Sequence, residues 1–118
     1  MPITFPWERI LTGWSITSLE VDNAVATATQ AGVSGKYQAI RTAEASYSNR
    51  NNSGLLTVTI GATVVARKYI HGTGAIDFGI EGIPGATGEG VTATLAASGT
   101  PGVTGAVMMT GVTLDANP

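Results

Sequence analysis

Hydrophobic and polar residues alternate along most of this chain. Leu56, Val58 and Ile60 alternate with two threonines, and the same period of two returns at residues 76–80 and 91–95. Successive side chains of a β-strand point to opposite faces of its sheet, so each of these segments has one apolar and one polar face. The pattern is typical of antiparallel strands that pack on one side against a core.

Eight such segments, separated by short turns, predict an all-β protein. Gly61 lies between two of them with almost no connection, and residues 49–54 form a polar loop of the kind that joins strands. The strands are predicted at residues 13–21, 23–30, 36–47, 54–60, 62–70, 75–80, 91–97 and 104–114. This number of short strands favours an antiparallel two-sheet sandwich of about eight strands, jelly-roll-like in its connections. The alternative is an immunoglobulin-like sandwich, whose paired cysteines this chain lacks.

The residues that keep one phase along these segments form the predicted core. In segment 36–47 the phase breaks, because Ile40 is out of step with Ala43 and Ala45. An extra residue in one strand of a pair produces such a break, so we expect a β-bulge near residues 41–42. The predicted core residues are Leu56, Val58, Ile60, Ile76, Phe78, Val91 and Leu95.

The first twelve residues do not share this alternation. Pro2 and Pro6 interrupt them, and proline is unsuited to a regular helix or a central strand. We therefore predict an extended N-terminal arm at residues 1–12 and a single β-sandwich domain at residues 13–118. The apolar side chains of the arm would contact either a neighbouring protein or the core of their own domain, and both alternatives are open here. These side chains are Ile3, Phe5, Trp7 and Ile10.

Composition narrows the possible functions. Charged residues make up 12% of the 118 residues, and the formal net charge is −2. Proteins that bind nucleic acids through phosphates need a basic surface, so no nucleic-acid partner is expected. The chain contains no cysteine, which excludes disulfides and thiolate metal sites.

The beginning of the chain has no cationic stretch followed by an uninterrupted apolar one, so we expect no secretory signal. No apolar run approaches the roughly 20 residues of a membrane-spanning helix. These two observations predict synthesis in a cytoplasm and no membrane partner.

Residues that could support catalysis or bind a metal are sparse. His71 is the one histidine, and the nearest carboxylates that follow it are Asp77 and Glu81. A zinc or iron site in a double-sheet fold would need more histidines than this. We expect no enzyme, no metal and no cofactor, with His71 solvated at the start of a turn at residues 71–74. Four serines have no predicted base beside them: Ser34, Ser46, Ser48 and Ser98.

Exposed aromatic rings could stack on sugar rings. A domain of this size needs most of its large rings in the core or at an interface, so we expect most of the candidates to be covered. The pair Arg67 and Lys68 is interpreted as a solvated strand edge. The candidate aromatic residues are Trp7, Trp14, Tyr37, Tyr47 and Tyr69.

A succession of small residues, turns and strands runs from about residue 35 to residue 114. It comprises Gly35-Lys-Tyr37 before Ala45-Ser-Tyr47-Ser48, then Gly54-Leu-Leu-Thr-Val58, then His71-Gly72 with Ile76-Asp-Phe78, and finally Pro84-Gly85 with Gly88-Glu-Gly-Val-Thr-Ala-Thr-Leu-Ala-Ala97. In this order the features resemble the small jelly-roll-like head decoration (cement) proteins of tailed bacteriophages.

The resemblance implies a structural virion protein that binds and stabilises the outer surface of a phage capsid. It implies the major capsid protein as partner, a homo-oligomer that is often a trimer, and no catalytic residues. We expect Ile3, Phe5, Trp7 and Ile10 to contact the capsid or a neighbouring subunit. The alternative function is that of a phage adhesin or fibre-tip module that binds host carbohydrate.

Overall fold

The computed structural model describes residues 10–80 and 82–115 and contains ten β-strands within them. All pairings between these strands are antiparallel. No helix that could cross a membrane occurs among these residues. The strands are β1 (Ile10–Thr17), β2 (Val21–Asp22), β3 (Ala26–Gln30), β4 (Lys36–Tyr47), β5 (Ser53–Ile60), β6 (Thr63–His71), β7 (Thr73–Asp77), β8 (Ile83–Pro84), β9 (Val91–Leu95) and β10 (Thr104–Asp115).

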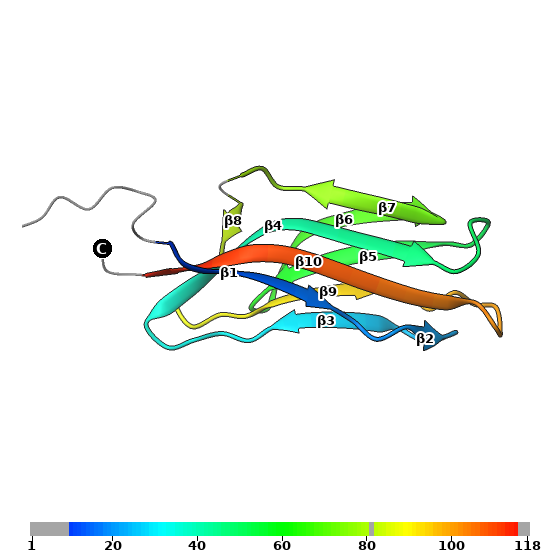
Figure 1. Ribbon diagram of the computed structural model, residues 1–118, viewed down its shortest axis with the longest axis horizontal. Helices are drawn as coiled ribbons and strands as arrows, with labels where there is room; N and C mark the ends of the chain where they lie inside the picture. Colours follow the sequence, from blue (N-terminus) through cyan, green and yellow to red (C-terminus); the bar gives the residue numbers. More distant parts are fainter. Residues whose placement is uncertain (1–9, 81, 116–118) are drawn as a thin grey trace, which may run out of the picture.

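The strands lie in two layers, which form the antiparallel sandwich that the alternation predicts (Figure 1). Sheet one has the order β1-β10-β4-β7, with β2 beside β10 and β8 beside β4. Sheet two has the order β6-β5-β9-β3. The two sheets meet where β6 turns into β7, and His71 and Thr73 form the pair between these strands.

The pairing order is that of a jelly roll. Among the eight longer strands in chain order, the first pairs with the eighth (β1, β10), the second with the seventh (β3, β9), the third with the sixth (β4, β7) and the fourth with the fifth (β5, β6). Four nested pairs make one long hairpin that is rolled into two sheets, as in double-sheet jelly rolls. The jelly-roll prediction is therefore confirmed.

Most strand boundaries differ from the predicted ones by a few residues, as at the following three places. Strand β1 begins at Ile10, which lies opposite Leu114, so residues 10–12 of the predicted arm pair with β10. The strand predicted at 23–30 begins at Ala26, because Asn23 has a positive φ of 47° and ends β2 in a turn. The strand predicted at 75–80 is β7, which lies two to three residues earlier. Ile3, Phe5 and Trp7 lie outside the described residues.

The core fills the space between the two sheets. Five of the seven predicted core residues are buried: Leu56, Val58, Ile60, Val91 and Leu95. The other two, Ile76 and Phe78, pack against the core but are less buried than predicted. They are half-buried because β7 is the edge strand of sheet one. The long central strands β4 and β10 contribute further large buried side chains, which are Ile40, Val107 and Met109.

Strand β4 carries the predicted β-bulge. Thr42 lies opposite Thr110 and Ile40 lies opposite Gly111, which leaves Arg41 as the extra residue. The bulge changes the phase of β4, so that Gln38 points into the sandwich together with Thr113, its partner on β10. A bulge near residues 41–42 is therefore confirmed.

A buried polar cluster surrounds Gln38 at this end of the sandwich. Its side-chain oxygen accepts hydrogen bonds from Trp14 Nε1 at 2.9 Å and from Thr113 Oγ1 at 2.7 Å. Its Nε2 atom donates to the carbonyl oxygen of Ala31 at 3.4 Å. Buried polar groups are tolerated when they are paired in this way, and the cluster ties β1, β4 and β10 together.

Tyr47 closes the opposite end of the core. Its ring packs against Gly54 and Gly105, and its hydroxyl donates a hydrogen bond to the carbonyl oxygen of Ala96 at 2.7 Å. Burial raises the pKa of Tyr47 above its usual value of 10.0, and the nearby phenol of Tyr69 raises it further. The folded protein therefore favours the neutral form of Tyr47.

A raised tyrosine pKa makes stability depend on pH in the alkaline range. The stabilisation from Tyr47 is fully present below pH 10.0, the pKa of an unfolded tyrosine, and is lost as the pH rises above it. In an absorbance titration of the folded protein, we expect the phenolate of Tyr47 to form at a pH above 10.0, the usual tyrosine value. The Tyr47→Phe variant should lack this step, and an unchanged titration curve above pH 10.0 in that variant would contradict the assignment.

Candidate binding surfaces

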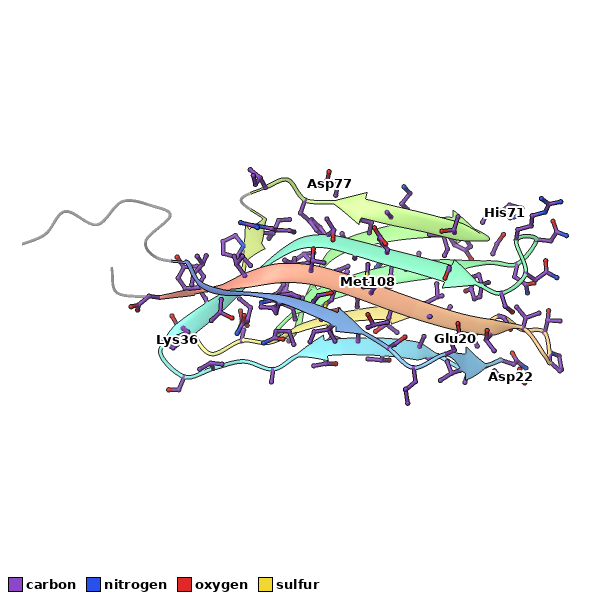
Figure 2. The ribbon with its side chains drawn as sticks, in the orientation of Figure 1. Glu20, Asp22, Lys36, His71, Asp77 and Met108 are labelled. Atoms are coloured by element: carbon purple, nitrogen blue, oxygen red, sulfur yellow. The ribbon has the colours of Figure 1, made fainter. Side chains whose placement is uncertain are left out.

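The residues singled out for acid–base or metal chemistry do not form a cluster. His71 and Asp77 are exposed and lie at different ends of the β7 edge (Figure 2). The Asp77 carboxylate accepts a hydrogen bond from the backbone N–H of Gly79 at 2.8 Å. Within the described ranges, no group of three or more His, Cys, Asp or Glu side chains could hold a metal ion. Glu81 is not among the described residues.

His71 has a hydrogen-bond partner that the sequence did not suggest. Ser53 lies opposite it in the β5–β6 pair, and Ser53 Oγ is 2.6 Å from His71 Nδ1. A nucleophilic serine needs a base that is itself oriented by a third group, and donors that stabilise an oxyanion. Both residues are exposed on the outer surface of sheet two, and neither lines the groove described below. The hydrogen bond holds the histidine ring in place.

The aromatic residues are only partly covered. Tyr47 is buried and Trp14 is half-buried, as expected for rings that fill a core. Tyr69 differs, because 75% of its surface is exposed and it points outward from β6. Its neighbour Lys68 bridges the gap to β7 by a 2.9 Å hydrogen bond from Nζ to the carbonyl oxygen of Ala75.

A shallow groove crosses the outer face of sheet one. It encloses about 230 Å³ and draws on β1, β10, β4 and β7, near the middle of β10, where Met108 lies (Figure 2). Strand pairing places Thr17, Met108 and Glu44 in one row across the sheet, and Ala106, Ser46 and Thr73 in the next. The groove is lined by Thr17, Glu44, Ala45, Ser46, Thr73, Ala106, Val107 and Met108.

Threonines cover the outer face of sheet two in a regular array. Three neighbouring strands each carry the pattern Thr-x-Thr, at residues 57–59, 92–94 and 27–29. Pairing aligns them in two rows across β5, β9 and β3. The array, which we call the threonine face, consists of Thr57, Thr94 and Thr27 in one row and Thr59, Thr92 and Thr29 in the other.

The surroundings of the threonine face carry little charge. Strand β6 extends the two rows with Arg67, opposite Thr57, and Val64, opposite Thr59. Tyr69 lies two residues from Arg67 on the same outward side. Of the outward residues on these four strands, Arg67 is the one with a full charge at neutral pH, and Tyr69 and His71 are the other ionisable ones. A nearly uncharged sheet face of this kind is suited to contact another surface.

Sequence reasoning missed both surfaces, although part of each signal is in the sequence. The alternation of β4 points Glu44 and Ser46 outward between buried alanines, and the three Thr-x-Thr patterns can be read directly. Local patterns do not reveal which strands lie side by side. The predicted contact residue Ile10 begins β1, while Ile3, Phe5 and Trp7 are not described by the structure.

No protein-family model matches the chain, and no curated protein matches it significantly. Solved structures with similar folds include the CBM36-1 domain of a multidomain xylanase from the hindgut metagenome of Trinervitermes trinervoides. That match has 12% identity, a TM-score of 0.47, and covers 86% of this chain and 96% of that domain. A second is a carbohydrate-binding module CBM36 in complex with calcium and xylotriose, with 18% identity, a TM-score of 0.38, and coverage of 79% and 75%. Likeness at this level carries no argument about what this chain binds.

Proposed function

We propose that this protein is a structural virion protein that attaches to the outer surface of a phage capsid through its threonine face. The observation that carries the proposal is the nearly uncharged array of six threonines on sheet two. The centres of protein interfaces are depleted in charged residues, while tyrosine and arginine are enriched there. Tyr69 and Arg67 border the threonine face on β6, and they are the anchors we expect in the contact.

The size of the threonine face indicates that it does not act alone. Together with the neighbouring strand β6 it covers four strands about 4.8 Å apart, which with about five residues each at about 3.3 Å span roughly 300 Å². A stable protein contact covers about 800 Å² on each partner. A second contact is therefore needed, and the apolar residues Ile3, Phe5 and Trp7 supply it in our proposal. They would reach the capsid or a neighbouring subunit of a trimer.

A charge in the middle of the threonine face should prevent attachment. In the Thr94→Lys variant, the new ammonium group would have to be desolvated against the capsid, so we expect the protein to stay in the supernatant when it is centrifuged with capsids. The matched control is Ser15→Lys, at an exposed position of β1 on the opposite face of the sandwich. The control should sediment with capsids as the wild type does.

Two results would contradict this proposal. One is the absence of the chain from purified particles of the phage that encodes it, measured by mass spectrometry. The other is equal sedimentation of the Thr94→Lys and Ser15→Lys proteins. A variant without residues 2–9 tests the second contact separately, because it keeps the threonine face and should bind more weakly while the sandwich remains folded.

A second candidate function is that of an adhesin or fibre-tip module that binds host carbohydrate. The groove on sheet one favours it, since a carboxylate and three hydroxyl groups face an open surface there. Binding of the isolated protein to a glycan array, without sedimentation with capsids, would support this function over the first.

A further inference from the structure

We propose that the groove on sheet one binds one ring of a neutral sugar, with the Glu44 carboxylate as acceptor of two sugar hydroxyl groups. The inference does not depend on attachment to a capsid, because the groove and the threonine face lie on opposite faces of the sandwich. A protein that is attached through the threonine face would keep the groove open to solvent. The site would then present a sugar-binding surface on the outside of the particle.

Among the described residues, Glu44 is the one charged residue that lines the groove. Among residues 10–80 and 82–115, no side chain or backbone N–H donates a hydrogen bond to its carboxylate, and no cation pairs with it. An ionised carboxylate is an acceptor with two oxygens and about four lone-pair sites. It can therefore accept from two adjacent hydroxyl groups of one ring, and charged acceptors form stronger hydrogen bonds than neutral ones.

The other lining groups match the rest of a sugar ring. Met108 lies directly opposite Glu44, and Ala106 lies opposite Ser46, so a thioether and a methyl group lie beside the carboxylate. An apolar surface of this kind fits the C–H face of a pyranose. The hydroxyl groups of Thr17, Ser46 and Thr73 surround it, and those of Thr17 and Ser46 can both donate to and accept from a ligand. The Thr73 hydroxyl donates to the carbonyl oxygen of Ala45 at 3.3 Å and keeps its lone pairs for a ligand.

Other ligand classes fit this groove less well. An anion would be repelled by Glu44, and none of the lysines and arginines that the structure describes lines the groove to attract one. A metal ion needs several oxygen ligands, and no cluster of acidic side chains in the described ranges supplies them. An ammonium or guanidinium group would find one carboxylate but no aromatic face. The volume of about 230 Å³ is below the range of about 300–1,000 Å³ for drug-sized ligands, so one ring is the expected size.

The test is an NMR titration of the ¹⁵N-labelled full chain with methyl glycosides of glucose, galactose, mannose and xylose. For at least one of them we expect a dissociation constant on the order of 1 mM, as for a ligand of about a dozen heavy atoms with few contacts. Shifted amide signals should be confined to residues that line the groove, such as Glu44, Ser46 and Met108. L-Arginine amide, titrated in parallel, tests a cationic ligand.

Substitutions separate the carboxylate from the surrounding surface. Glu44→Gln keeps the shape of the side chain but removes its charge, so sugar binding should weaken about tenfold. Glu20→Gln removes an exposed carboxylate outside the groove and should leave binding unchanged. The proposal is overturned if no glycoside shifts the groove signals when it is added in roughly 100-fold molar excess over the protein, where millimolar binding would be detected. It is also overturned if arginine amide alone shifts them. Capsid attachment by the Glu44→Gln protein should equal that of the wild type, so failure of this inference is distinct from failure of the proposed function.

Discussion

Replacement of Gln38 by leucine is expected to lower the free energy of unfolding by about 2–5 kcal/mol. The substitution leaves the Thr113 hydroxyl and the Trp14 indole N–H without the oxygen to which both donate. Each buried donor that loses its partner costs about 1–3 kcal/mol of stability. Gln38 is fully buried, so water does not readily reach the two donors in place of its side-chain oxygen. The loss is a large fraction of the total stability of a domain, which is about 5–15 kcal/mol.

Urea denaturation, followed by tryptophan fluorescence, measures this effect directly. Gln30→Leu is the matched control, because Gln30 is the other glutamine and lies half-exposed at the end of β3. Its stability should remain within about 0.5 kcal/mol of the wild type. A Gln38→Leu protein with the wild-type midpoint would show that the cluster of Gln38, Trp14 and Thr113 does not contribute to stability.

The Leu56→Ala substitution should lower the free energy of unfolding by about 2–5 kcal/mol. Leu56 has no exposed surface and lies on β5 opposite Leu95 in the middle of sheet two. The substitution removes buried apolar surface and leaves a cavity that the two packed sheets cannot close without moving. The midpoint of urea denaturation measures the loss.

Two further variants, one of a leucine and one of a phenylalanine, give stability losses with which that of Leu56→Ala can be compared. Leu19→Ala changes a side chain that is 84% exposed, so its stability should stay within about 0.5 kcal/mol of the wild type. Phe78→Ala should cost less than Leu56→Ala, because Phe78 is half-buried beside the edge strand β7. A larger loss for Phe78 than for Leu56 would mean that the core is centred on β7 and not on β5.

The sequence predicted local features well, because each depends on neighbouring residues. The alternation of Leu56, Val58 and Ile60 identified the buried face of β5, since side chains two residues apart share a face. The phase break at Ile40 identified the bulge at Arg41. Gly61 marked the tight turn between β5 and β6, where its φ of 59° is one that glycine adopts easily.

Long-range pairing was decided by the tertiary structure. Three Thr-x-Thr patterns, at residues 27–29, 57–59 and 92–94, are visible in the sequence, but their meeting in one sheet depends on β9 pairing with both β3 and β5. In the same way, Glu44 and Met108 are 64 positions apart and become neighbours because β4 pairs with β10. Alternation determines which face of a strand is buried, whereas the order of strands depends on the packing of the whole chain. The sequence by itself therefore determined the class of fold and the large buried residues of β5 and β9, and only the tertiary structure brought together the groove and the threonine face.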